Sequence, residues 1–297
     1  TVLKELGFTR HPLAPCVVLM YSPTKEFTGV ISIETDDLLG GGIGQKWHQA
    51  VEKLKNRFEF GKWNWLMDNK MEYGGRTLVQ LTDYGFEISM ARYLKEKGKE
   101  IHITRGRDNE AMATPAEITG LRGLIGNLNW ATREGMPQGA GEASILASTL
   151  PTPKVKDLRE ANAAYRRLLA TADTPVPIRP IPLKRLVLVT FTDSSLANAG
   201  GGLSQICYMV CAADCSIRDG AFADISCLTF KSHKNKKAGS ATLLVEANGM
   251  SEGLAETEWV ASWIGVAKDF SYDLRKRHLR NREIKVTTVM REPECLK

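Results

Sequence analysis

The chain lacks the sequence signals of membrane and secreted proteins. It has no run of about 18 consecutive apolar residues, and no basic segment followed by an apolar segment opens it. We therefore expect an intracellular protein, cytoplasmic or nuclear and not secreted, whose thiols are kept reduced. Internal repeats and low-complexity tracts are also absent, which excludes solenoid and collagen-like architectures.

The sequence is also poor in the residues of several enzyme classes. Only 5 histidines are present, and none stands in a Gly-x-Ser-x-Gly setting or pairs with a recognisable cysteine signature. Nucleophilic hydrolases of those types are therefore excluded. Among the 6 cysteines, those at positions 207, 211 and 215 are spaced by four. This spacing matches no common zinc or iron–sulfur pattern, so we expect apolar packing.

What is present is typical of a globular protein that carries a mild basic excess. The chain has 297 residues, 43% hydrophobic and 25% charged, enough for about two domains. Lys and Arg number 40 against 34 Asp and Glu, which gives a net charge of +6. This balance permits a nucleic acid or another anionic partner without establishing one.

Hydrophobic spacing and turn residues predict a succession of elements. Thr114, Pro115 and Glu117 are typical of a helix start, with a capping box and Pro at the first helical position. Four prolines between positions 175 and 182 predict a linker, because they exclude a helix or a central strand. Helices are predicted at 45–58, from 115, at 154–171 and at 241–268. Strands are predicted at 17–21, 29–33, 77–81, 86–90, 186–191, 203–212, 226–232 and 283–290. Strands, then a helix, then a strand in the second half predict an α+β protein with a mixed sheet and a helix on its face.

Two adjacent carboxylates, Asp36 and Asp37, follow one predicted strand. Like charges this close favour a nearby cation, and Mg²⁺ takes one or two carboxylates together with substrate phosphates. The alternative is a solvated turn whose Asp side chains hydrogen-bond to the backbone.

The glycine-rich segment 40–44 comes next and precedes a predicted helix. Gly40 and Gly42 fit the first and third places of a dinucleotide-binding fingerprint, but the sixth place is Gln45. A turn that binds a dinucleotide cofactor is therefore kept as an alternative.

A second pair of carboxylates lies in the other half of the chain. Asp193 stands at the end of the predicted strand 186–191, and Glu246 stands early in the long helix. Two-metal hydrolysis of phosphodiesters needs carboxylates that converge from separate elements in this way. Glu252, Glu256 and Glu258 are alternatives on the same helix, and a solvated acidic helix face is the non-catalytic interpretation.

Two basic segments flank that helix. The first contains Lys231, Lys234, Lys236 and Lys237, and the second covers residues 275–282. Both could neutralise phosphates. Neither is interleaved with aromatic residues that could stack on bases, so a solvated loop remains open for each.

Several blocks carry a family resemblance. They are Glu-Thr-Asp-Asp at 34–37 before an apolar pair and glycines, Leu-Arg-Gly-Leu-Ile-Gly-Asn-Leu-Asn-Trp-Ala-Thr-Arg at 121–133, Phe-Thr-Asp-Ser-Ser-Leu-Ala at 191–197, Leu-Thr-Phe-Lys-Ser-His-Lys at 228–234 and Val-Glu-Ala-Asn-Gly-Met-Ser-Glu at 245–252. In this order they resemble the C-terminal part of the Pol polyprotein of copia-type LTR retrotransposons. The first two are similar to the Tyr-x-Asp-Asp box and the Leu-Arg-x-x-Ile-Gly-x-Leu-x-Trp block of its reverse transcriptase. The last three resemble the first metal motif, the Trp-x-Ser-x-Lys strand and the acidic helix of its ribonuclease H.

The resemblance implies a division of the chain and a chemistry. Residues 1–173 correspond to the end of a polymerase palm with thumb and connection-like elements, 174–182 to a Pro-rich linker, and 183–297 to a ribonuclease H-like fold that is incomplete at its C-terminus. The parent activity is RNA-directed DNA synthesis and cleavage of RNA in RNA–DNA hybrids, with Mg²⁺, or alternatively Mn²⁺, as cofactor. Asp36, Asp37, Asp193 and Glu246 are implied as metal ligands and catalytic residues, with Glu246 selected over Glu252. The implied partner is an RNA–DNA hybrid, contacted by Lys231, Lys234, Lys236 and Lys237.

The chain also departs from the family pattern. Glu34 stands where the family has Tyr, the other polymerase aspartate would lie ahead of Thr1, and the predicted strand at 283–290 carries no Asp. A metal site that loses a ligand leaves its remaining charges poorly compensated. We therefore expect a fragment or relic of the polyprotein, inactive or severely impaired as an enzyme. Three functions stay open, namely hybrid cleavage, salt-sensitive nucleic-acid binding without catalysis, and a dinucleotide enzyme acting through Gly40–Gly44.

Overall fold

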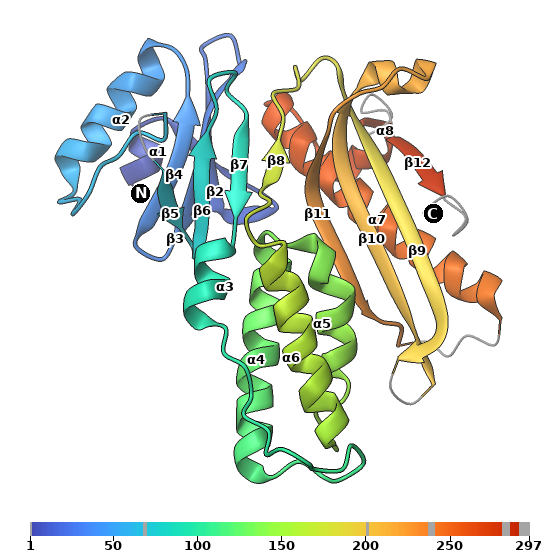
Figure 1. Cartoon of the computed structure of the whole chain (residues 1–297). Coiled ribbons are helices and arrows are strands. Elements are labelled where there is room, and N and C mark those ends of the chain that lie inside the picture. The colour runs from blue at the N-terminus through green and yellow to red at the C-terminus, as the bar shows by residue number, and fades with distance from the viewer. Residues whose placement is uncertain (1, 68–69, 200–201, 237–240, 281–285, 291–297) are drawn as a thin grey trace. The chain divides into compact units, whose positions relative to one another are not determined.

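A computed structural model describes residues 2–67, 70–199, 202–236, 241–280 and 286–290 (Figure 1). The chain divides into two compact units, one of residues Thr1–Asn69 and Thr257–Val286 and one of residues Lys70–Glu256 and Thr287–Lys297. The predicted boundaries at 173 and 183 follow the Pro-rich segment and the family resemblance, and they stay a prediction.

In the described residues, runs of strands are followed by runs of helices, as Figure 1 shows. The helices are α1 (Val2–Glu5), α2 (Gln45–Arg57), α3 (Ala91–Lys97), α4 (Pro115–Glu134), α5 (Ala140–Ala147), α6 (Val155–Ala170), α7 (Thr242–Lys268) and α8 (Arg277–Arg280). The strands are β1 (Phe8–His11), β2 (Ala14–Tyr21), β3 (Phe27–Glu34), β4 (Asp37–Gly42), β5 (Met71–Tyr73), β6 (Arg76–Gln80), β7 (Phe86–Ser89), β8 (Val176–Ile178), β9 (Leu186–Ala199), β10 (Leu203–Asp214), β11 (Ile225–Lys234) and β12 (Val286–Met290). Short 3₁₀ helices lie at Pro137–Gly139, Cys215–Asp219 and Leu274–Lys276.

The first unit is built on an antiparallel sheet in the order β1-β2-β3-β4. Helix α2 buries Trp47, Val51 and Leu54 on one face, whereas Phe58, the last residue of the helix predicted at 45–58, follows the helix and is exposed. The C-terminal part of α7 belongs to this unit. There Tyr21 donates a hydrogen bond from Oη to the carbonyl of Val266 at 2.6 Å.

The second unit contains a second antiparallel sheet and a helix bundle. The sheet has the order β5-β6-β7-β8. Strand β8 comes from the Pro-rich segment and lies at the sheet edge, the position that a strand containing proline can occupy. Helices α3, α4, α5 and α6 enclose an apolar core around residues such as Leu121, Leu128 and Leu158. Helix α4 begins with the predicted capping box between Thr114 and Glu117.

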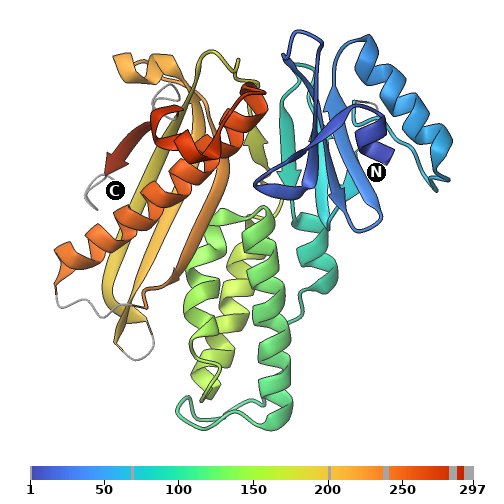
Figure 2. The same ribbon diagram turned by 180° about the vertical axis from the view of Figure 1, so that it is seen from behind.

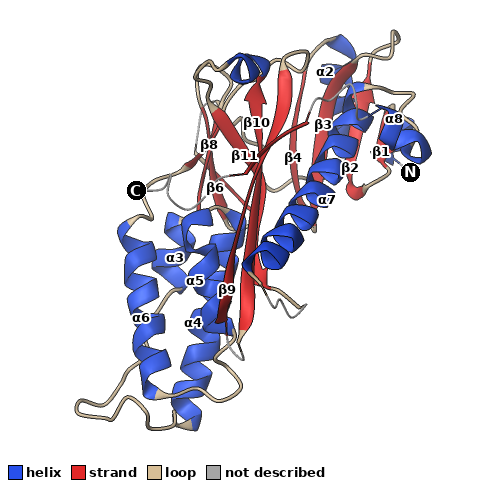
Figure 3. Cartoon of the chain, turned by 90° about the vertical axis from the view of Figure 1, so that its right-hand side faces the viewer, coloured by secondary structure: helices blue, strands red, loops and turns tan. Residues whose placement is uncertain are grey.

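The third sheet also lies in this unit and has the order β11-β10-β9-β12. The pairs β9–β10 and β10–β11 are antiparallel, and α7 leads from β11 to β12. Two glycines let α7 approach the sheet closely. A Cβ atom on Gly253 would lie 2.5 Å from Cγ2 of Thr192, and one on Gly249 would lie 2.5 Å from Oγ of Ser194. Figure 3 shows the long helix running beside these strands.

These elements confirm the predicted α+β class, with antiparallel sheets and helices. The predicted strands at 186–191, 203–212 and 226–232 and the helix at 241–268 are all present. The view from behind in Figure 2 shows α7 between the third sheet and the viewer.

Candidate metal centre and nucleic-acid interface

Asp193 and Glu246 lie on two elements that pack on each other. Ser194, next to Asp193 on β9, donates a hydrogen bond from Oγ to the carbonyl of Val245 at 3.2 Å, and Val245 precedes Glu246 on α7. Burial raises the pKa of Glu246, and the negative charge of Asp193 raises it further. The two carboxylates are therefore close enough to repel each other.

The thiol of Cys207 lies near both Asp193 and Glu246. Cys207 pairs with Asp193 in the register between β9 and β10. Burial is the main cause that raises the pKa of the Cys207 thiol, and the charges of both Asp193 and Glu246 add to it. The spacing of the cysteines gave no indication of this neighbourhood, because it depends on strand register.

The alternation of side chains along β9 sets the direction of Asp193. Ser194 faces α7, so Asp193 leaves the strand toward the opposite face, where it is exposed. One of its oxygens, Oδ1, accepts a hydrogen bond from the backbone N–H of Ser194 at 2.8 Å. Hydrogen bonding from Ser194 also acts on Glu246, where it lowers the pKa, so both carboxylates lie beside Ser194.

The alternative glutamates on α7 have other partners. Glu252 pairs with Nε2 of His233 on β11 at 2.9 Å. Glu256 accepts hydrogen bonds from Tyr208 at 3.4 Å and Thr229 at 3.3 Å, and burial together with the charge of Glu256 raises the pKa of Tyr208 to about 12.

The donor set fits a single hard cation. Within the part of the chain that the structure describes, no group of three or more His, Cys, Asp or Glu side chains gathers as a metal site would require. Mg²⁺ needs only one or two carboxylates when water and substrate phosphates complete its shell. Asp193 and Glu246 therefore fit one Mg²⁺, and these residues do not supply the ligands of a two-metal centre.

The basic segment lies partly on β11. Lys231 pairs with Tyr208 and Lys234 pairs with Gln205. They are three positions apart, so their side chains leave opposite faces of the strand. Lys236 follows the strand and is exposed, whereas Lys237 lies outside the described residues. Burial lowers the pKa of His233, and the positive charges of Lys231 and Lys236 lower it further, which places both ammonium groups near His233.

Asp36 and Asp37 lie at the tip of the β3–β4 hairpin. Asp37 begins β4 and pairs with Glu34, so Thr35 and Asp36 form a two-residue turn. Thr35 has a φ of 53°, as such turns require. Both Asp side chains are exposed.

The glycine-rich turn predicted at Gly40–Gly44 is wrong. Gly40, Gly41 and Gly42 belong to strand β4, which pairs antiparallel with β3. A Cβ atom on Gly42 would lie 2.3 Å from the ring of Trp47, and one on Gly29 would lie 2.2 Å from it. These glycines let the Trp47 ring lie on the sheet. The dinucleotide alternative loses its basis, because that fingerprint belongs to the turn of a parallel βαβ unit.

The remaining predictions near this site have mixed outcomes. A strand is present at Val286–Met290, next to β9, whereas residues 283–285 lie outside the described residues. Within the described ranges, no helix is long and apolar enough to cross a membrane.

Comparisons with known proteins gave no match to a family model and no match to a curated protein. The chain is similar to a solved structure of the foamy viral protease-reverse transcriptase in complex with an RNA/DNA hybrid. The TM-score is 0.45 and the identity 10%, over 89% of this chain and 36% of that one. The chain thus spans about a third of the length of that protein, and a likeness of this extent does not identify a family.

Proposed function

We propose that this chain is a piece of a copia-type reverse transcriptase–ribonuclease H polyprotein and that it binds RNA–DNA hybrids through β9, β10, β11 and α7. The observation that carries the proposal is the hydrogen bond from Ser194 to Val245. It joins β9 and α7 at the residues next to Asp193 and Glu246, which the sequence motifs select independently. They come from segments about 50 positions apart in the chain, yet the packing of α7 on β9 brings them into range.

Asp193 and Glu246 would hold one Mg²⁺ in this account. The mutual repulsion that raises the pKa of Glu246 is relieved when a divalent cation lies between the two charges. The ion, when bound, supplies positive charge beside a phosphate of the hybrid and polarises it. The hydrogen bond of Ser194 holds β9 and α7 together at this point. It thereby fixes the backbone positions of the two residues whose carboxylates would bind the ion.

The basic segment supports a polyanionic ligand. Lys231 and Lys236 lie around His233, and neutralising backbone phosphates would relieve the repulsion among these positive groups. Lys234, on the other face of β11, and Lys237 complete the proposed interface.

Asp36 and Asp37 are proposed as the remnant of a polymerase site. They are exposed at a hairpin tip, where a metal ion and a nucleotide could reach them. Here, as at Asp193 and Glu246, only two carboxylates gather in the described residues, which is too few for a two-metal centre. We therefore propose no nucleotide transfer by this chain alone and a hybrid cleavage that is absent or severely impaired.

The experiment measures the binding and cleavage of a short RNA–DNA hybrid by the full chain, with Mg²⁺ and with a chelator. We expect affinity that falls steeply with salt and rises with Mg²⁺ beyond the general effect of ionic strength. In Asp193→Asn the rise with Mg²⁺ disappears, whereas in Lys236→Gln overall affinity falls and the rise remains. Equal Mg²⁺ dependence in wild type and Asp193→Asn would contradict the site, and affinity independent of salt would contradict the interface.

A further inference from the structure

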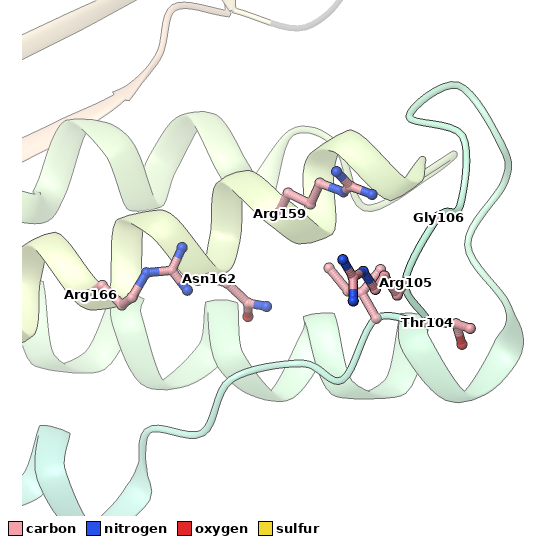
Figure 4. A pocket seen from close by; sticks show the side chains of 7 residues that line it. Thr104, Arg105, Gly106, Arg159, Asn162 and Arg166 are labelled. Carbon is pink, nitrogen blue, oxygen red and sulfur yellow. The ribbon is translucent and has the colours of Figure 1, made fainter.

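A cavity lined by three arginines lies in the second unit, away from the residues of the proposed hybrid interface. Its volume is about 350 Å³, and it opens between helix α6 and the segment that leads into α4. Figure 4 shows Arg159, Asn162 and Arg166 on the helix and Arg105 on the segment that faces it. Positions 159, 162 and 166 share one helix face because their spacings are three and four.

The segment opposite the helix is held in place by several hydrogen bonds. The buried Asn162 side chain accepts from the backbone N–H of Ile101 at 2.8 Å and donates to its carbonyl at 2.9 Å. Tyr165 donates to the carbonyl of Gly98 at 3.2 Å. Arg159 donates to the carbonyl of Arg107 at 3.0 Å. The two walls of the cavity are thus joined on both sides of Arg105, whereas the side chains of Arg105 and Arg159 are exposed to solvent.

The cavity also has an excess of positive charge. Of the three arginines that line it, Arg105 and Arg159 have no carboxylate paired with them among the residues that the structure describes. The acids nearby are engaged. Glu100 pairs with Arg166 at 2.6 Å, and Glu110 pairs with Lys154 and Lys156, which lower its pKa to about 2. Among the residues that the structure describes, the Arg105 side chain makes no hydrogen bond and no ion pair.

We propose that this cavity binds a phosphate group. Guanidinium groups present parallel N–H donors that match two phosphate oxygens at once. Arg105 would supply such a fork, Arg159 keeps donors that its bond to the Arg107 carbonyl does not use, and the hydroxyl of Thr104 lies on the same wall. A phosphate that carries two negative charges balances the excess better than a single carboxylate does. A cavity of about 350 Å³ admits a small phosphate-bearing molecule.

Calorimetric titration of inorganic pyrophosphate into the full chain tests this assignment, in chloride buffer at fixed ionic strength. We expect one binding site, weakened about tenfold or more in Arg105→Gln. Arg159→Lys, which keeps the charge and loses the planar fork, is expected to weaken binding by a smaller factor. The control is Arg92→Gln on α3, an exposed arginine paired with Glu96, which should bind like wild type. Unfolding curves of each variant check that the fold is intact.

The same variants distinguish the source of the phosphate. If Arg105→Gln weakens pyrophosphate binding and leaves hybrid binding unchanged, the cavity takes a free phosphate compound. If Arg105→Gln weakens both pyrophosphate binding and hybrid binding, the cavity takes a backbone phosphate of the bound nucleic acid. Absence of pyrophosphate binding in the wild type, or equal binding in a folded Arg105→Gln, would overturn the proposal. Neither result depends on Asp193 or Glu246, so the failure of this proposal and that of the proposed function are separable.

Discussion

Ser194 Oγ donates a hydrogen bond to the carbonyl of Val245, and this contact joins the strand that carries Asp193 to the helix that carries Glu246. The register that makes the bond also sets the direction of Asp193, since neighbouring residues of a strand face opposite ways. The site is therefore defined by how closely α7 approaches β9. That approach depends on glycines in the helix.

Gly253 tests the closeness of this packing. A Cβ atom there would lie 2.5 Å from Thr192 Cγ2 and 3.3 Å from Tyr208 Cβ. We expect Gly253→Ala to lower the free energy of unfolding by about 1 kcal/mol or more, because overpacking outweighs the gain in helix propensity. Gly126→Ala on the open face of α4 is the matched control, because no atom would lie within 4 Å of its Cβ. This substitution should raise the free energy of unfolding by about 1 kcal/mol. Denaturant unfolding measures both, and a stabilised Gly253→Ala would contradict the packing.

The start of α4 gives a second prediction. Glu117 accepts hydrogen bonds from the backbone of Thr114 and from Arg107, and these bonds hold its pKa below the usual value. Thr114→Ala should cost about 1 kcal/mol of stability through the lost cap. Glu117→Ala should cost about 1.5–3 kcal/mol, because Arg107 loses its charged partner. Thr119→Ala, at an exposed position inside the helix, is the control. Unfolding midpoints that rank Thr119→Ala as the most damaging would refute this assignment.

His11 gives a third prediction, on pH dependence. It is fully buried, stacks on Trp263, and accepts a hydrogen bond at Nδ1 from the N–H of Leu13 at 3.1 Å. Burial lowers its pKa below 6.5. The unfolded chain therefore binds the proton more tightly, so this contribution to stability is complete above pH 6.5 and is lost as the pH falls toward the folded pKa.

The measurement is the free energy of unfolding of wild type and His11→Gln between about pH 5 and 7.5. Wild type should lose stability toward the acidic end, and the variant should show a shallower slope. His233, whose pKa is also lowered, accounts for a remaining slope in the variant. Identical slopes in the two proteins would show that His11 does not titrate as the packing requires.

Local sequence signals predicted much of the fold. The capping residues of α4, the apolar stripe of α2 and the strand runs of β9, β10 and β11 each depend on neighbours in the chain. The prediction of a turn at the glycines 40–42 was wrong for a physical reason. The Trp47 ring packs on the strand where a glycine leaves room for it, and sequence spacing does not show which aromatic ring packs on which strand.

The candidate site was predictable only in part. The motifs select Asp193 and Glu246, whereas the position of Cys207 beside them depends on the register between β9 and β10. The arginine cavity had no sequence signal, because Arg105 and Arg159 are far apart in the chain and meet through the Asn162–Ile101 hydrogen bonds.

The most direct test of the central claim is a calorimetric titration of Mg²⁺ into the full chain and into Asp193→Asn and Glu246→Gln. The control is Glu252→Gln, a residue of the same helix that pairs with His233. We predict one bound ion in the wild type and in the control, with affinity reduced on the order of tenfold or more in each of the two site variants. Wild type without a bound ion, or site variants that bind Mg²⁺ as tightly as Glu252→Gln, would contradict the account.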